Sequence, residues 1–270
     1  MPPVSQPKAS RSRAAYIQPV TFTLIAHRGY SDEAPENTLA AFDLALQRGY
    51  RHLEPDAQLT SDGAPVVIHD DDLDRTTDGH GRLRAHTLEA VRALSASAGR
   101  VEYATERVPT LDEVLTRYAG RVRLHLELKS AEQELPSIVV AACNDRGWAA
   151  PTDTDDVPGL TMTSFHVEQL YRSRRLLPDI PHGWLLTRIT EADLDLTQQL
   201  GLAEICPRAD TLTPDAVAEA TRRGVRVRAW GVRNEDDLLQ AARAGAWGTT
   251  VNWPDRARDA LTADGIEVAR

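Results

Sequence analysis

Two acidic residues separated by a single position, Glu54 and Asp56, stand at the end of an apolar run and could bind a metal ion. If the run is a strand, alternation places both carboxylates on one face and Pro55 on the other. Two inward acids at a strand end would repel each other unless a cation joined them, and a hard divalent ion with oxygen ligands meets that need. The alternative is a pair of exposed acids beside a loop. Because Pro55 lacks a backbone donor, strand pairing on one side is predicted to end there.

A third acid lies in the run Leu124-His125-Leu126-Glu127-Leu128-Lys129, where polar residues alternate with leucines. Alternation directs His125, Glu127 and Lys129 to one face, an arrangement that a core does not favour unless it serves a purpose. We expect Glu127 to be the third carboxylate on the metal ion and Lys129 to supply positive charge to a phosphate. The alternative for Glu127 is a salt bridge with a neighbouring residue.

Two histidines could move protons at the same place. One strand candidate ends in Ala26-His27-Arg28-Gly29 and another in Val66-Val67-Ile68-His69-Asp70. Imidazoles flanking a metal-bound phosphate form an acid–base pair, in which one activates the attacking oxygen and the other protonates the leaving alkoxide. Arg28 could hold a phosphate oxygen through charge-assisted hydrogen bonds. Taken alone, His27 is also compatible with a structural or surface role.

Other residues give weaker signals. Trp230 and Phe165, each at the end of a strand candidate, could pack against a substrate, and core packing explains them equally well. The arginine-rich stretches Arg172–Arg175 and Arg222–Arg228 are predicted to be solvated helix faces and strand edges. Five other histidines are predicted to be structural or at the surface: His52, His80, His86, His166 and His182.

The elements that must position these residues alternate along the chain, which indicates parallel strands in an α/β architecture. The strand candidates are Phe22–Ala26, Arg51–Asp56, Val66–His69, Val122–Leu128, Leu160–Phe165, Gly183–Leu186, Ala203–Cys206, Val225–Gly231 and Thr249–Asn252. Helical patterns include Thr38–Arg48, Leu111–Tyr118, Glu132–Arg146, Val167–Leu176, Glu191–Leu200, Pro214–Arg223 and Glu235–Ala244.

One strand candidate is predicted to belong to a hairpin. The segment Gln58–Pro65 is too short for a parallel crossover, which needs about a dozen residues, and Asp62-Gly63 within it is a hairpin turn signal. Val66–His69 should therefore run antiparallel beside the second strand and bring His69 back to the acidic pair. Eight parallel strands are left, which predicts a (β/α)8 TIM barrel, a fold that typically needs about 250 residues.

The rest of the chain sets the context of the barrel. Residues 70–106 are predicted to be an insertion that caps the top of the barrel, with one short helix over His86–Leu94. Residues 1–20 lack the apolar core of a signal peptide and are predicted to be a flexible tail, with one domain over 21–270. No run of 18 apolar residues suggests a transmembrane helix, and a cytoplasmic location is expected. The net charge of −9 argues against nucleic acid or an anionic membrane as the main partner.

A series of short motifs runs along the chain: His27-Arg28-Gly29, Ala34-Pro35-Glu36-Asn37-Thr38, Glu54-x-Asp56, Thr60-x-Asp62-Gly63, Val66-Val67-x-His69-Asp70, Leu73-x-Arg75-Thr76-Thr77-x-Gly79, Pro109-Thr110-Leu111-x-Glu113 and Glu127-x-Lys129. In order and spacing they resemble the glycerophosphodiester phosphodiesterase family. The resemblance covers roughly residues 22–256. It is dense over 27–129 and thinner afterwards, where Ser164-Phe165 and Trp230 extend it.

The resemblance implies a TIM barrel with a cap inserted after the second histidine, and hydrolysis of glycerophosphodiesters to glycerol 3-phosphate and an alcohol. It implies that His27 and His69 are the acid–base pair and that Arg28 and Lys129 lie near the phosphate. It implies one Mg2+ or Ca2+ ion on Glu54, Asp56 and Glu127. The chain departs from the family at Pro55, at His125, at Gly231-Val232-Arg233 and at Val251-Asn252, which leaves the preferred substrate open.

Two other functions are weighed against this one. A lysophospholipase D, or a phospholipase D-like lyase on a related barrel, shares the two histidines and the Glu-x-Asp pair. An apolar loop facing a membrane would favour it, and the chain shows no obvious one. A barrel that only binds glycerophosphodiesters, or that has a structural role, is disfavoured because every expected catalytic side chain is present. The leaving alcohol, the choice between Mg2+ and Ca2+, the acid and base among the histidines, a cyclic phosphate intermediate and the oligomeric state are not determined by the sequence.

Overall fold

The computed structural model describes residues 21–153, 155 and 157–269. The expected tail over residues 1–20 lies outside the described residues, and the division into tail and one domain stays a prediction. None of the described helices combines the length and the apolar composition that crossing a lipid bilayer requires.

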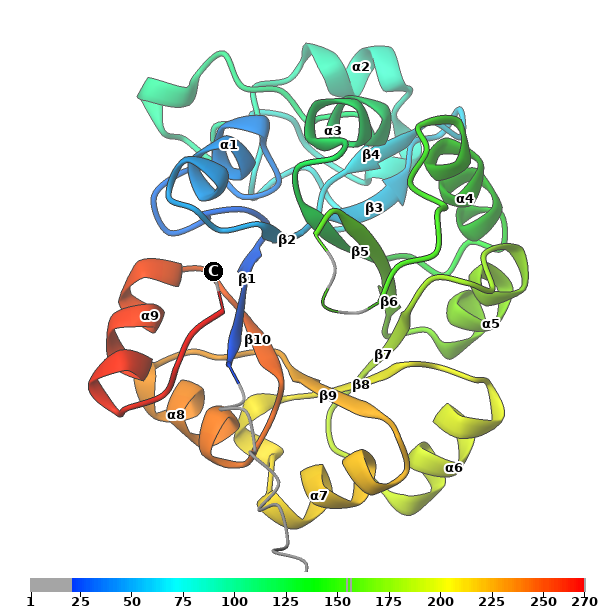
Figure 1. The fold of residues 1–270 in the computed structure, drawn as a ribbon. Coiled ribbons are helices and arrows are strands. Elements are labelled where there is room, and N and C mark those ends of the chain that lie inside the picture. The colour runs from blue at the N-terminus through cyan, green and yellow to red at the C-terminus, as the bar shows by residue number, and fades with distance from the viewer. Residues whose placement is uncertain (1–20, 154, 156, 270) are drawn as a thin grey trace, which may run out of the picture.

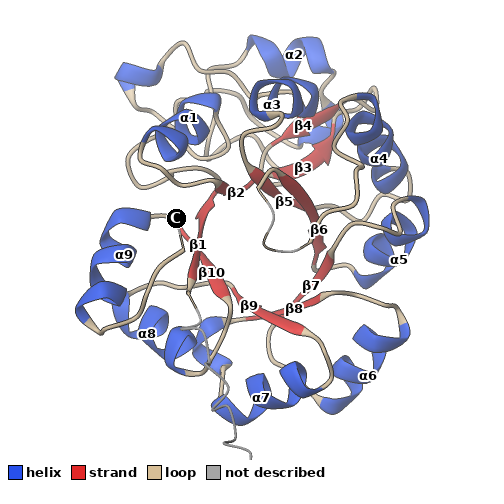
Figure 2. Ribbon diagram, in the orientation of Figure 1, coloured by secondary structure: helices blue, strands red, loops and turns tan. Residues whose placement is uncertain are grey.

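The described strands close into a barrel, and the helices form a ring around it (Figures 1 and 2). The strands are β1 (Thr23–His27), β2 (His52–Glu54), β3 (Asp56–Leu59), β4 (Pro65–Val67), β5 (Arg123–Leu128), β6 (Gly159–Ser164), β7 (His182–Leu186), β8 (Glu204–Pro207), β9 (Arg226–Ala229) and β10 (Gly248–Val251). Parallel pairing runs from β1 through β2 to β5, then in order to β10, which returns to β1. This closed parallel barrel confirms the predicted fold class.

The helices lie between successive strands and pack on the outside of the barrel. They are α1 (Leu39–Gln47), α2 (Leu88–Ala93), α3 (Leu111–Tyr118), α4 (Leu135–Asp145), α5 (Val167–Leu176), α6 (Glu191–Gln199), α7 (Pro214–Arg222), α8 (Glu235–Arg243) and α9 (Pro254–Ala263), with the short 3-10 turns η1 (Leu83–Ala85), η2 (Val101–Tyr103) and η3 (Ala209–Thr211). Threonine hydroxyls accept the first free N–H groups of several helices, and Thr110 forms a capping box with Glu113 at α3. Helix α4 begins three positions after the expected Glu132, because Pro136 fits only the first turn of a helix.

Pro55 divides the second barrel strand into β2 and β3. The pairing of β1 with β2 ends at His27 and Glu54, whereas β3 pairs with β5 from Asp56 onward. The prediction that pairing ends at Pro55 on one side is therefore confirmed. The expected end of this strand at Asp56 is wrong, since β3 continues to Leu59. Strand β4 runs antiparallel to β3, as the hairpin prediction required.

The insertion over residues 70–106 has a small core of its own. Its apolar side chains pack against residues of the segments that lead out of the barrel and back into it. The cluster consists of Val66, Ile68, Leu73, Leu83, Val91, Ala96 and Val108. The expected helix His86–Leu94 is shorter, because Thr87 caps α2. Hydrogen bonds from Ala40 to Glu106 and from Arg92 to Glu113 hold the insertion against α1 and α3. Its expected position above the barrel mouth stays a prediction.

The barrel interior contains charged side chains. Val227 and Ala229 of β9 join the core between sheet and helices, so alternation directs Arg228 toward the barrel axis. Arg228 is 1% exposed, and its Nε lies 3.7 Å from Glu204 Oε2. The prediction that the whole stretch Arg222–Arg228 is solvated is therefore wrong at Arg228, where burial follows from strand alternation rather than from composition.

Candidate active site

Three carboxylates converge where β2 ends, where β3 begins directly after Pro55, and near the carboxyl end of β5. One oxygen each of Glu54, Asp56 and Glu127 lies within 4.8 Å of the other two, and all three residues are buried. The strand register explains this convergence, because Asp56 and Glu127 are direct partners across β3 and β5. The carboxyl ends of barrel strands form the active face of this architecture. The structure thus brings together the three acids that the sequence singled out.

Two oxygens of the buried acids have no hydrogen-bond partner. Glu54 Oε2 and Asp56 Oδ1 are buried and accept no hydrogen bond from the described residues. Burial, together with the nearby charges of Asp56 and Glu127, raises the pKa of Glu54 well above its usual range. Burial and the charge of Asp56 raise the pKa of Glu127 to about 7. Unpartnered hard oxygens that repel each other fit a divalent cation such as Mg2+ or Ca2+.

Asp56 is the one acid of the three whose charge is well supported. Its Oδ2 accepts a hydrogen bond of 2.8 Å from Asn37 Nδ2 and lies 3.4 Å from Arg28 Nε. Burial acts to raise its pKa, but the charges of Arg28 and Lys129 outweigh burial, and the pKa of Asp56 lies below its ordinary value. Asp56 is therefore ionised even without a cation.

Arg28 is held in position by an unusual backbone. Its φ of 57° lies in the left-handed region, and Gly29 follows with φ of 85°. A Cβ on Gly29 would come within 2.6 Å of the Ala41 carbonyl carbon, so only glycine fits there. Arg28 Nη1 donates to Glu36 Oε1 at 2.8 Å. This tight turn aims the guanidinium at the carboxylates, and a non-glycine residue at positive φ is typical of functional sites.

His27 ends β1 beside Glu54. Its Nε2 lies 3.9 Å from Glu54 Oε2, and its Nδ1 lies 2.6 Å from Asn252 Oδ1. Burial, and next the charge of Arg28, lower the pKa of His27 to about 4. The charge of His69 also lowers this pKa. At neutral pH the His27 ring is uncharged and able to accept a proton.

His69 follows β4 and is held from both sides. Its Nδ1 lies 2.6 Å from Asp70 Oδ1, and Asp70 in turn accepts hydrogen bonds from Arg75. Gln58 Nε2 donates to the main-chain oxygens of Ile68, His69 and Asp70, which fixes the backbone that carries the ring. Burial lowers the pKa of His69, while the charge of Asp56 and the hydrogen bond that His69 donates to Asp70 act in the opposite direction.

Lys129 and two aromatic residues line the other side of the carboxylates. Lys129 Nζ donates to Glu127 Oε1 at 3.0 Å and lies 5.4 Å from the centre of the Phe165 ring. Phe165 meets Trp230 edge to face, with ring centres 4.9 Å apart, and Trp230 Nε1 donates to the Leu186 carbonyl. Phe165 is 39% exposed, so this aromatic pair presents a surface to the mouth rather than filling the core.

Comparison with known proteins identifies the family of this chain. The model of the family described as "Glycerophosphoryl diester phosphodiesterase family" matches residues 27–256. The chain belongs to this family. It is an enzyme of the glycerophosphodiester phosphodiesterase class, which confirms the resemblance found in the sequence.

Relatives match along most of their length. A glycerophosphodiester phosphodiesterase of Caldanaerobacter subterraneus subsp. tengcongensis is 31% identical over 234 residues, covering 86% of this chain and 94% of that protein. Mouse glycerophosphodiester phosphodiesterase 1 is 30% identical over 271 residues, covering 86% of this chain and 78% of the mouse protein. A phosphodiesterase of Oleispira antarctica, solved in complex with its product sn-glycerol-3-phosphate, superposes with a TM-score of 0.80 at 31% identity, covering 89% and 96% of the two chains.

Sequence reasoning did not assign roles to the residues that orient the site of this phosphodiesterase. Asn37 supports Asp56, Asn252 contacts His27, and Glu36 joins Arg28 to Arg75. Asn37 has a φ of 56° directly before the capping residue of α1, and its position in the motif Ala34-Pro35-Glu36-Asn37-Thr38 was the available signal. No local signal pairs Asn252 with His27, since 225 positions separate them.

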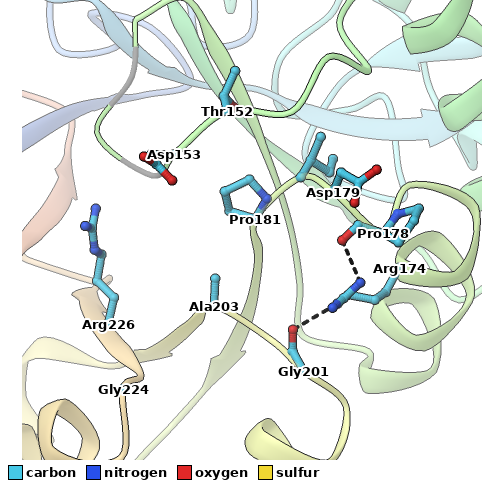
Figure 3. Close-up of a pocket in the computed structure, with 11 residues that line it drawn as sticks. Thr152, Asp153, Arg174, Pro178, Asp179, Pro181, Gly201, Ala203, Gly224 and Arg226 are labelled. Carbon is cyan, nitrogen blue, oxygen red and sulfur yellow. Dashed lines mark hydrogen bonds between the residues drawn. The ribbon is translucent and has the colours of Figure 1, made fainter.

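A hollow of about 390 Å3 opens at the end of the barrel opposite to the carboxylate cluster (Figure 3). Residues at the amino ends of β7, β8 and β9 line it, among them Pro181, Ala203 and Arg226. Its cations are engaged: Arg174 donates to two main-chain carbonyls, and Arg226 pairs with Asp155. Because these groups have protein partners and the carboxylate cluster lies at the other end, this hollow is not the candidate active site.

Proposed function

We propose that this phosphodiesterase hydrolyses small glycerophosphodiesters to glycerol 3-phosphate and an alcohol, with His27 and His69 as the acid–base pair. The observation that carries the proposal is a buried group of three carboxylates with unpaired oxygens, where His27 Nε2 lies 3.9 Å from Glu54 Oε2. The product in the related Oleispira antarctica structure, sn-glycerol-3-phosphate, supports the same substrate class.

Glu54, Asp56 and Glu127 would hold one divalent ion, Mg2+ or Ca2+. When bound, such an ion stabilises the negative charge that develops on the phosphoryl oxygens. Two cationic side chains of the protein would stabilise the same negative charge. Arg28 and Lys129 both contact the acidic cluster and have N–H groups that can bind the phosphate oxygens.

The histidines supply the proton transfers. One imidazole accepts the proton of the attacking oxygen, and the other donates a proton to the alkoxide that leaves. Asn252 and Asp70 fix the Nδ1 atoms of His27 and His69, so each ring keeps Nε2 for the reaction. Trp230 and Phe165 pack against an organic part of the substrate, because their edge-to-face pair lies beside Lys129 at the mouth.

The test is a metal-dependence assay on three substrates. Purified protein is incubated with glycerophosphocholine, glycerophosphoethanolamine or a lysolipid, in the presence of Mg2+, Ca2+ or EDTA. Release of glycerol 3-phosphate from the glycerophosphodiesters only with a divalent ion is expected. Cleavage of the lysolipid alone would replace the proposal with a lysophospholipase D, and full activity in EDTA would remove the metal from it.

A further inference from the structure

A hollow of about 490 Å3 adjoins the carboxylate site on the side of the insertion. Its volume lies within the range of small-molecule sites, about 300–1,000 Å3. Two of its lining residues connect it to the site. Lys129 donates to Glu127, and Gln58 donates to the main-chain oxygen of His69. A phosphate bound by Lys129 would therefore have this hollow beside it, and we call the hollow the alcohol pocket.

The alcohol pocket carries polar atoms without partners. Ser130 Oγ and Glu132 Oε2 are buried and have no hydrogen bond within the described chain. Arg82, an exposed residue of the insertion that lines the pocket, makes no side-chain hydrogen bond or ion pair with any described residue. Arg84, by contrast, is engaged, since it donates to the Thr60 carbonyl and lies 3.4 Å from Glu132 Oε1. The pocket thus has an unpaired guanidinium at its exposed edge and two unsatisfied oxygens within its wall.

This lining lacks the apolar groove and the aromatic faces by which two of the common alcohols of glycerophosphodiesters are recognised. An acylated glycerol needs an apolar groove, and Ala131 is the one aliphatic residue in the lining of this pocket. A quaternary ammonium is recognised by aromatic faces. The lining contains no Phe, Tyr or Trp, and Lys129 Nζ already lies 5.4 Å from the centre of the neighbouring Phe165 ring. Hydroxyl groups both donate and accept, so they match what the pocket offers.

We propose that the alcohol pocket binds the leaving alcohol and selects a small polyol, with several hydroxyl groups, over a quaternary ammonium alcohol or an acylated glycerol. This inference rests on the proposed hydrolysis of glycerophosphodiesters. Arg82 and Ser130 are binding residues for the polyol hydroxyls. A site built to bond hydroxyl groups discriminates against analogues that lack them, because its own polar atoms then stay unpaired.

The test compares kcat/KM for glycerophosphoglycerol, glycerophosphoinositol and glycerophosphocholine at saturating Mg2+. The wild-type protein is expected to favour the two polyol substrates by about tenfold or more. Arg82→Ala and Ser130→Ala are each expected to lower the polyol-to-choline ratio about 5- to 20-fold. Ser130→Ala removes a single oxygen and is the variant least able to disturb the fold.

Arg107→Ala is the matched control, because Arg107 donates only to the carbonyls of Ala104 and Glu106 and does not line the pocket. Its ratio should equal that of the wild-type protein. Equal kcat/KM for polyol and choline substrates in the wild type, or an unchanged ratio in both pocket variants, would overturn the alcohol pocket while leaving hydrolysis intact. No release of glycerol 3-phosphate from any of the three diesters, with either Mg2+ or Ca2+, would overturn the proposed function and the pocket together.

Discussion

His27 and Asn252 meet at the seam where β1 and β10 close the barrel, with Nδ1 of the imidazole 2.6 Å from Oδ1 of the amide. An amide oxygen only accepts hydrogen bonds, so the Nδ1 atom of the ring donates. This fixes the neutral tautomer and leaves the Nε2 lone pair on the side of Glu54, 3.9 Å away. The residue directly after the last strand thus determines which nitrogen of the first strand's histidine can react.

Replacing Asn252 with alanine should impair turnover rather than binding. We expect Asn252→Ala to lower kcat about 10- to 100-fold with little change in KM, the scale of losses when the orienting partner of a ligand or base is removed. Asn252→Asp keeps the acceptor and adds a negative charge, which raises the pKa of His27 and shifts the limb of the pH–kcat profile that reports on it to higher pH. Steady-state kinetics over a pH series measure both effects, and an unchanged kcat in Asn252→Ala would contradict the role.

The two histidines should be indispensable for turnover and dispensable for folding. His27→Ala and His69→Ala are each expected to lower kcat/KM at least about 1,000-fold, since each removes one proton transfer. Their thermal unfolding midpoints should stay within a few degrees of the wild type. His80→Ala is the control, because His80 is 85% exposed on the insertion and should keep full activity. Near-normal rates in both variants would refute the acid–base assignment.

The carboxylate cluster should lower the stability of the cation-free protein, and a bound cation should raise it. Adding Mg2+ or Ca2+ to the wild-type protein should raise its melting temperature. At a free cation concentration of 100 times the Kd, binding should stabilise the native state by about 3 kcal/mol. Glu54→Gln should lose that rise and be at least as stable as the wild type without cations, because it removes a buried acid whose pKa burial already raises. Glu89→Gln, on the exposed face of α2, should keep the rise. The readout is differential scanning fluorimetry, and a cation response in Glu54→Gln equal to that of the wild type would exclude this residue as a ligand.

His182 should make the protein sensitive to acid. The ring is 1% exposed, and burial lowers its pKa from 6.5 to about 4. The unfolded chain therefore binds a proton as the pH falls through 6.5, while the native state does not until about pH 4. Stability is intact above pH 6.5 and declines below it, with a loss of about 2 kcal/mol by pH 5. Urea unfolding at pH 7 and 5 measures the loss.

His182→Asn serves as the comparison, because asparagine can still donate to the Ile180 carbonyl that His182 Nδ1 contacts and cannot ionise. The difference in stability between pH 7 and pH 5 should be smaller in this variant by about 2 kcal/mol. Equal pH dependence in the two proteins would show that the His182 ring is not the group responsible.

The sequence determined the barrel and the chemistry at its mouth. The alternation of strands and helices, the short hairpin before His69 and the spacing of Glu54, Asp56 and Glu127 are local patterns. Each pattern limits which face a side chain occupies, and parallel strands place their carboxyl ends together whatever the details of packing. These features could therefore be predicted without coordinates.

The tertiary structure alone decided the contacts that cross the barrel. Asn252 reaches His27 because the barrel closes in one particular register, and Arg228 is buried because its strand position faces the axis. The alcohol pocket forms where the insertion that carries Arg82 meets the loop after β5 that carries Ser130. Such contacts depend on how distant segments are staggered and packed, and that stagger leaves no trace in the periodicity of any one segment.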